Sequence, residues 1–195
     1  MTGMQNFYKI KGCCPDFWDG QESVIHGIIS KGQRIQLSRS GSAVPVFSVP
    51  VFSPLLVTEE GKALLLESKF RGLSFQAVDY DNIVDIGWHT WEEEEEIPED
   101  EFVFDFASVI LDSTKHRPDL MLDMPKMFEV ITEFTVVPLQ EYWKVDMAGH
   151  EGQRIVNVLH KDGSIRYSMV SQEGKEWFLE NGEGWLEFIE LEVTS

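Results

Sequence analysis

The sequence predicts an α+β fold with a mixed or mostly antiparallel sheet and two short helices. The stretch VTEEGKALLLESKFRGLSFQAV from Val57 recurs without a gap as VSQEGKEWFLENGEGWLEFIEL from Val170, and eight of the twenty-two positions are identical. Each copy has the pattern of one strand-helix-strand unit, so we interpret the pair as an internal duplication. Segments rich in β-branched and aromatic residues fill most of the remaining chain, which favours strands. Asp162-Gly163, between two such segments, is a strong signal for a two-residue hairpin.

The two predicted helices begin at equivalent residues. Thr58 and Ser171 each precede acidic or amide side chains, which suits an N-cap oxygen that accepts a backbone N–H near the positive end of the helix dipole. We expect helices of two to three turns whose apolar blocks are residues 64–66 and 177–179.

A glycine occupies the first turn of each predicted helix. Gly61 and Gly174 cost about 1 kcal/mol each relative to alanine at such positions. Either a close packing approach requires a glycine there, or the two positions tolerate it by chance.

The strand candidates are short and separated by turn signals. Pro45, Pro50 and Pro54 each remove a backbone donor, so the segment that contains them is confined to a sheet edge or an irregular crossing. Segment 102–112 fits a strand or a short buried helix, and 112–126 is expected to connect the two halves. The other candidates, in chain order, are 7–10, 24–29, 34–38, 44–52, 73–78, 83–91, 127–137, 141–147, 154–160, 165–170 and 185–193.

Composition places the chain among globular proteins, with 43% hydrophobic residues, enough for a buried core. We expect one domain over residues 1–195, built from two related halves of roughly 1–112 and 113–195. No apolar run approaches the roughly 20 residues that span a bilayer, and the first residues lack the pattern of a signal peptide, so a cytoplasmic protein is expected. Cys13 and Cys14 are adjacent, which excludes an ordinary disulfide between them and leaves too few thiols for a zinc site.

Charge is distributed unevenly along the chain. Residues 1–78 carry a net charge of +2, whereas residues 79–195 carry −20. Such a field repels phosphate and membrane surfaces and attracts basic partners, so we expect no nucleic-acid or membrane binding.

The densest acidic stretch is WEEEEEIPEDEFVFD, which contains no cation. Two tryptophans immediately before or within it suit an aromatic anchor beside a charged rim, although core packing is the alternative for each. A solvated loop that only aids solubility is the alternative for the acids. The predicted partner-binding residues are Trp88, Trp91, Glu92, Glu93, Glu94, Glu95, Glu96, Glu99, Asp100 and Glu101.

Local signatures of catalysis or metal binding are missing from the sequence. The five histidines form no HExxH motif and no i, i+4 pair, and there is no GxSxG, P-loop or GxGxxG motif. Asp79, Asp81 and Asp85 lack the glycine and terminal glutamate of an EF-hand loop, and solvated carboxylates at a strand end are the better interpretation. We therefore predict no catalytic residues, no metal site and no cofactor.

The segment from Pro50 to Val78 resembles a pattern common among bacterial polymorphic-toxin immunity proteins. That pattern is a strand ending in Leu-hydrophobic-Val, a Ser/Thr-Glu helix start, a short helix and a Gly-hydrophobic-x-Phe strand. One subgroup of the family carries paired Cys-x-x-Cys-Gly motifs, which Cys13-Cys14 do not reproduce. The residues that match are Leu55, Leu56, Val57, Thr58, Glu59, Gly72, Leu73 and Phe75.

The resemblance implies a non-enzymatic cytoplasmic binder that occludes the active site of a toxin domain. Our first hypothesis is therefore an immunity protein whose acidic surface recognises a basic toxin, such as a nuclease. The alternatives are a small enzyme in which His89, His150 or His160 meets a carboxylate in a cleft, and a general acidic interaction or scaffold protein. The oligomeric state stays open.

Overall fold

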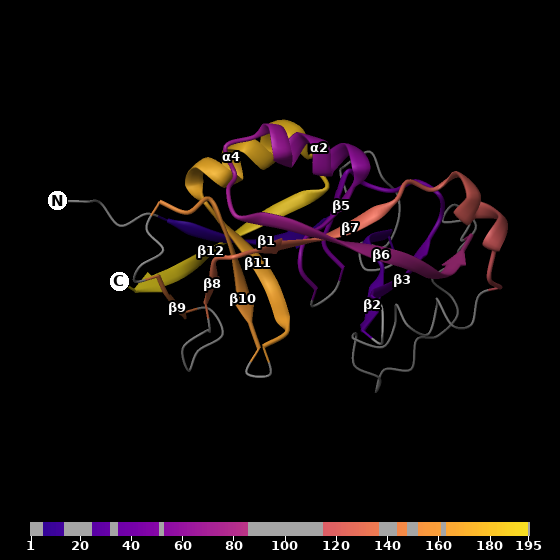
Figure 1. The fold of residues 1–195 in the computed structure, drawn as a ribbon, viewed down its shortest axis with the longest axis horizontal. Helices are drawn as coiled ribbons and strands as arrows, with labels where there is room; N and C mark the ends of the chain where they lie inside the picture. Colours follow the sequence, from indigo (N-terminus) through magenta and orange to yellow (C-terminus); the bar gives the residue numbers. More distant parts are fainter. Residues whose placement is uncertain are drawn as a thin grey trace, which may run out of the picture.

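The computed structural model describes residues 6–13, 25–31, 35–50, 53–85, 115–136, 144–147, 152–160 and 163–194. These residues form two sheets, two α-helices and a 3-10 helix (Figure 1). In chain order the elements are β1 (Phe7–Gly12), β2 (Ile28–Lys31), β3 (Ile35–Ser40), β4 (Phe47–Ser48), β5 (Leu56–Thr58), α2 (Glu59–Glu67), β6 (Leu73–Val84), η2 (Pro118–Asp123), β7 (Met127–Thr132), β8 (Thr135–Val136), β9 (Lys144–Asp146), β10 (Ile155–Leu159), β11 (Ile165–Ser171), α4 (Gln172–Asn181) and β12 (Leu186–Thr194).

The described strands are arranged in two six-stranded sheets. The first sheet has the order β2-β3-β6-β7-β5-β4, and the second has the order β8-β10-β11-β1-β12-β9. Most neighbours are antiparallel, while β3 with β6, β9 with β12 and β8 with β10 are parallel. The predicted α+β class with mixed sheets is confirmed, and the proline-flanked strand β4 lies at a sheet edge as predicted.

The duplication extends beyond the repeat seen in the sequence. Units β5-α2-β6 and β11-α4-β12 each hold one further strand between their two strands, which is β7 in the first sheet and β1 in the second. The registers match residue for residue, because Val57 faces Phe128 where Val170 faces Tyr8. Likewise, the parallel neighbour of β6 is β3 and that of β12 is β9.

The two copies differ in the position along the sequence of their middle strand. β7 follows its unit in the sequence, whereas β1 comes from the beginning of the chain and pairs with β11 and β12. The predicted halves of 1–112 and 113–195 therefore do not correspond to the sheets. Backbone pairing puts β1 into the later unit and β7 into the earlier one, since strand pairing does not depend on closeness in the sequence.

The helix starts agree with the prediction. The side chains of Thr58 and Ser171 accept hydrogen bonds from the amides of Gly61 and Gly174, at 3.3 and 3.2 Å. The helices have 9 and 10 residues, which is two to three turns.

The two glycines are required by a close approach. A Cβ on Gly61 would lie 2.6 Å from the carbonyl oxygen of Val46, and a Cβ on Gly174 would lie 2.6 Å from that of Arg154. These carbonyls accept the amides of the two N-cap residues, at 3.1 Å in both copies. Chance tolerance is therefore excluded at both positions.

One apolar core joins the two units. Leu65 of α2 and Phe178 of α4 are buried in it together with Phe47 and Phe70. Figure 1 shows both helices on the same side of the molecule, over the strands that line this core. The last residue of each predicted apolar block points elsewhere: Leu66 and Leu179 are 63% and 56% exposed, because a helix that lies on a core can bury only one face.

A buried polar network also links the sheets. The hydroxyl of Ser168 in β11 donates to Asn157 Oδ1 at 2.9 Å and accepts from the amide of Leu55 at 3.3 Å. Asn157 Nδ2 donates to the carbonyl of Val130 in β7 at 3.4 Å. Such satisfied buried groups orient the two units relative to each other.

The predicted hairpin is present, because β10 and β11 pair in antiparallel fashion. The predicted two-residue turn is wrong, because the amide of His160 donates to the carbonyl of Ser164 and three residues separate this pair. Gly163 has a φ of 85°, a conformation that favours glycine.

Candidate functional site

All ten predicted partner-binding residues belong to segment 86–114, which lies outside the described residues. Their prediction therefore remains a prediction: Trp88, Trp91, Glu92 to Glu96, Glu99, Asp100 and Glu101. What the structure does describe is the two ends of this segment, hereafter the acidic segment.

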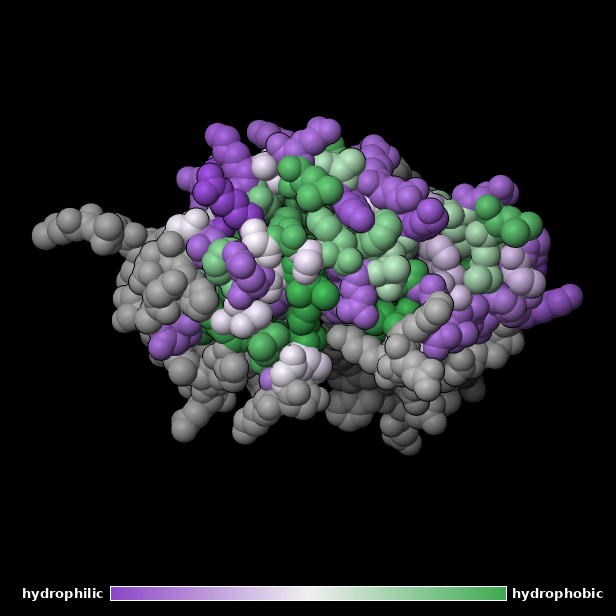
Figure 2. Space-filling view, in the orientation of Figure 1, coloured by the Kyte–Doolittle hydropathy of each residue, from purple (hydrophilic) through white to green (hydrophobic). Residues whose placement is uncertain are grey.

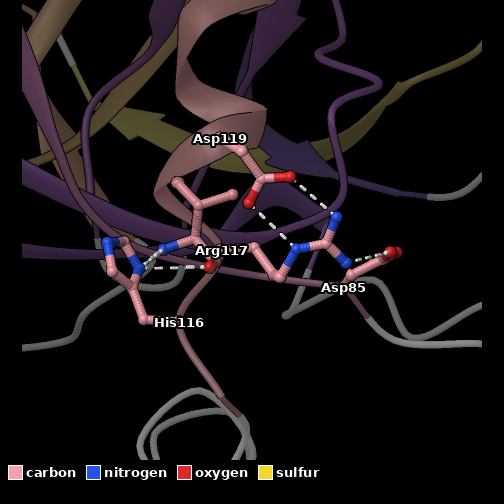
Figure 3. Close-up of polar contacts among 5 residues, drawn as sticks. Asp85, His116, Arg117 and Asp119 are labelled. Atoms are coloured by element: carbon pink, nitrogen blue, oxygen red, sulfur yellow. Dashed lines mark hydrogen bonds and ion pairs between the residues drawn. The ribbon is translucent and has the colours of Figure 1, made fainter.

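The two ends of the acidic segment are adjacent in space (Figure 3). Val84, the last residue of β6, forms an isolated antiparallel bridge with His116. Next to it, the amide of Arg117 donates to the carbonyl of Ile83 at 2.7 Å, and the amide of Ile83 donates to Nδ1 of His116 at 3.0 Å. The chain thus leaves and re-enters the first sheet at one place.

Side chains reinforce this closure. The guanidinium of Arg117 donates to both carboxylate oxygens of Asp119, at 2.9 and 2.8 Å, and to Asp85 at 3.2 Å (Figure 3). The hydrogen bonds from Arg117 lower the pKa of Asp119, and those to Asp119 raise the pKa of Arg117. Because the three side chains are exposed, the ion pairs contribute little to global stability. Their local effect is to join Asp85 and Arg117 across the ends of the acidic segment.

The surroundings of this closure are acidic. Asp79 and Asp81 are exposed on β6 and Asp123 on η2, against the exposed Lys115 directly before His116. The hydroxyl of Tyr80 donates to the carbonyl of Pro125 at 2.7 Å, which ties β6 to the chain after η2. Within the part of the chain that the structure describes, no three His, Cys, Asp or Glu side chains cluster in a way that suits a metal ion.

A serine and a histidine lie within hydrogen-bonding distance in the core, so they require a separate test of the enzyme hypothesis. Nδ1 of His26 lies 3.0 Å from the hydroxyl of Ser48, and Nε2 lies 3.0 Å from the carbonyl oxygen of Cys13. Both side chains are buried, at 1% and 2% exposure. The amide of Val49 also donates to Nδ1, at 3.2 Å, so this nitrogen must keep a lone pair.

His26 is therefore held neutral. Burial lowers the pKa of its imidazole to about 4, and the positive charge of Arg39 acts in the same direction. A buried histidine whose two nitrogens are occupied by the protein supports the fold, and the pair has no exposed atom to offer a substrate.

Arg39 is a fully buried cation, another feature that can indicate a functional site. Its guanidinium donates to the carbonyls of Ile25 and Ala43, at 3.0 and 2.6 Å, while Nη1 has no hydrogen-bond partner among the described residues. Burial lowers the pKa of Arg39 to about 10, so it stays charged at neutral pH. Because its two bonds hold the chain on either side of β2 and β3, we assign it a role in the fold.

The histidines named for the enzyme hypothesis do not meet in the described structure. His89 and His150 lie outside the described residues. His160 is exposed at the start of the β10–β11 turn, and its backbone amide donates to the carbonyl of Ser164. The closure between Asp85 and Arg117 was missed by sequence reasoning, since two residues so far apart in the chain carry no local signal of their contact.

Comparison with family models finds no match for this chain, and comparison with curated proteins finds none either. In the described part of the structure, neither α-helix has the length and apolar character that crossing a membrane requires. The resemblance to immunity proteins thus rests on the residues quoted above.

Proposed function

We propose that this protein is a cytoplasmic, non-enzymatic immunity protein that binds a cognate basic toxin domain through its acidic surface and so neutralises the toxin. The observation that carries the proposal is the acidic run, nine carboxylates without a cation, in a segment whose two ends are joined at the end of β6. We expect the carboxylates of this run to provide the contact with the partner.

Charge supports the class of partner. The chain has a net charge of −18. Part of it comes from Asp79, Asp81 and Asp123, which are exposed on β6 and η2, the elements that flank the closure. An acidic surface accelerates encounter with a basic protein, and it disfavours nucleic acid as the partner. The two strongest enzyme-like features in the described residues, His26 with Ser48 and Arg39, are buried and bonded to the protein itself.

Toxicity of the neighbouring gene is the direct test. We expect the product of the adjacent open reading frame to be toxic when expressed alone and harmless when this chain is co-expressed. A neighbour that is harmless by itself would contradict the proposal.

Kinetics then test the acidic segment. Replacing Glu92 to Glu96 with glutamine should lower the association rate with the purified neighbour, and the wild-type rate should fall steeply as salt is raised. The matched control is Glu187→Gln with Glu190→Gln, two exposed carboxylates on β12, for which a smaller loss per charge is expected. Equal association of wild type and the glutamine variant at low and high salt would eliminate the acidic run as the recognition element.

The tryptophans are distinguished by a second measurement. If Trp88 or Trp91 is an interface anchor, truncation to alanine raises the dissociation rate and leaves stability unchanged. If it is a core residue, the free energy of unfolding falls by about 3–5 kcal/mol.

A further inference from the structure

The positions that are identical in the two copies of the repeat can be divided into those that the fold requires and those that it does not. Eight positions are identical in the two copies, and the structure explains most of them. Val57 and Val170 are buried, and Gly61 and Gly174 face a carbonyl that leaves no room for a Cβ. Further identical pairs also contact the core, namely Leu73 with Leu186 and Phe75 with Phe188.

The identical lysines also have a structural role. The ammonium of Lys62 lies 4.2 Å from the ring centroid of Phe128, and that of Lys175 lies 4.0 Å from the ring centroid of Tyr8. Phe128 and Tyr8 occupy equivalent positions on the two middle strands, so the same cation–π contact is present twice.

The identical Glu60 and Glu173 lie in the first helix turn, where the helix dipole favours a negative charge. The identical residues that remain are Leu66-Glu67 in α2 and Leu179-Glu180 in α4. The two leucines are 63% and 56% exposed, and the two glutamates are exposed as well. Both glutamates lie in the last turn of their helix, where a negative charge opposes the helix dipole and where neither helix has a basic residue. Leucine and glutamate favour helices, but so do several other residues, and neither leucine packs against the core among the described residues. Both copies nevertheless retain the same two residues.

The two Leu-Glu pairs lie on one side of the molecule. Both helices cover the same side of the sheets in Figure 1, and in Figure 2 hydrophobic residues reach the surface there among hydrophilic ones. The ring of Trp177 in α4 makes an edge contact with the ring of Phe70, three residues after the end of α2, with ring centroids 5.1 Å apart. Both helices thus border the same core contact. We name this surface the helix face, defined by α2 and α4.

The charge of the helix face decides which partner fits it. Its acids outnumber its lysines, and both lysines contact aromatic rings. Two of its six acids are paired with cations outside the helices, Glu59 with Lys126 and Glu173 with Arg154. A second copy of this chain would bring the same negative charge against it. A basic protein surface complements it. The acids are Glu59, Glu60, Glu67, Glu173, Glu176 and Glu180.

We propose that the helix face is a second docking surface for the basic toxin domain of the proposed function, in which Leu66 and Leu179 each enter an apolar recess of the toxin and Glu67 and Glu180 each pair with a lysine or arginine beside it. This inference rests on the proposed function. It extends that function, because it assigns the apolar contacts to residues on two rigid helices rather than to the acidic segment.

The test uses the purified product of the adjacent open reading frame as the probe. Leu66→Ser combined with Leu179→Ser should raise its dissociation rate by about tenfold or more, since exposed apolar anchors act mainly on residence time. Each single variant should give part of this effect. Glu67→Gln combined with Glu180→Gln should lower the association rate at low salt, and the difference should shrink at high salt.

Ile165→Ser is the control. Ile165 is partly buried at the first residue of β11, at the opposite end of that strand from Ser171, which caps α4, and it belongs to the second sheet rather than to the sheet that holds the closure. Its replacement should leave dissociation unchanged, and thermal unfolding should show that all variants remain folded. Unchanged dissociation of the double leucine variant, with the wild type binding normally, overturns the docking surface and leaves the proposed function standing. Absence of binding by the wild type overturns both.

Discussion

The backbone of Gly61 lies so close to Val46 that a Cβ on the glycine would stand 2.6 Å from the carbonyl oxygen of Val46. Gly174 and Arg154 repeat this relationship in the second unit at the same distance. The same two oxygens accept the amides of Thr58 and Ser171. In each copy the contact therefore joins the beginning of the outer strand of the pair, β4 or β10, to the junction of its neighbouring strand and helix.

Gly61→Ala and Gly174→Ala should each destabilise the protein. Alanine gains about 1 kcal/mol in helix propensity over glycine, but the clash involves backbone and requires the helix to shift. We expect a net loss of about 1–3 kcal/mol in the free energy of unfolding. Urea titration followed by circular dichroism measures it. Glu60→Ala, at an exposed first-turn position, is the control and should change stability little; a stabilised Gly61→Ala variant would contradict the close approach.

Removal of an N-cap hydroxyl should cost about 1 kcal/mol, and up to about 2 kcal/mol, per helix. Thr58→Ala and Ser171→Ala each leave an amide, that of Gly61 or Gly174, without its acceptor in a buried place. Thr58→Ser and Ser171→Thr keep the acceptor oxygen and serve as controls. If the alanine and hydroxyl variants unfold at the same denaturant concentration, the caps contribute nothing.

Stability should fall as the pH is lowered from about 6.5 to about 4, in part because of His26. Burial lowers the pKa of His26 in the folded state to about 4 from the ordinary 6.5. Between these values the unfolded chain binds more protons than the folded one, so the contribution is complete above pH 6.5 and is lost as the pH falls through the window. Its full size is about 3 kcal/mol.

His26→Gln isolates that contribution, since glutamine does not titrate. The difference in unfolding free energy between wild type and His26→Gln should shrink as the pH falls through the window. A difference that stays constant from pH 7 to pH 4 would show that His26 keeps an ordinary pKa.

Deletion of residues 1–12 should abolish cooperative folding of the second sheet. β1 is an interior strand of that sheet and pairs with β11 on one side and β12 on the other, so its loss exposes two strand edges and part of the core. Loss of protection from hydrogen exchange in β11 and β12 is the expected result. Retained protection in both strands would be incompatible with the observed pairing.

A permuted chain provides the matching control. Phe7 faces Leu191 in antiparallel register, so the beginning of β1 lies next to the end of β12. Residues 1–13 joined by a short linker after residue 194 should restore folding, and this order repeats that of the first unit, where β7 follows β6.

The starts of the two helices could be predicted from the sequence, whereas the face that each helix exposes could not. Thr58, Ser171 and the glycines three residues later are local signals, because a cap hydrogen bond and the helix dipole act within one turn. The repeat therefore predicted both helices at their observed starts. The exposure of Leu66 and Leu179 could not be predicted in the same way, because an apolar run of three residues does not reveal which helix face meets the core.

What the sequence by itself determined about this protein is its α+β class, its duplicated strand-helix-strand unit and the hairpin of β10 and β11, all of which depend on interactions between near neighbours. Only the tertiary structure decided that β1 completes the second sheet, that β7 completes the first, and that Arg117 joins Asp85 across the acidic segment. The physical reason is that strand pairing and ion pairing join residues through space, and short apolar strands such as FYKIKG and MFEVIT carry no mark of the partner they will choose.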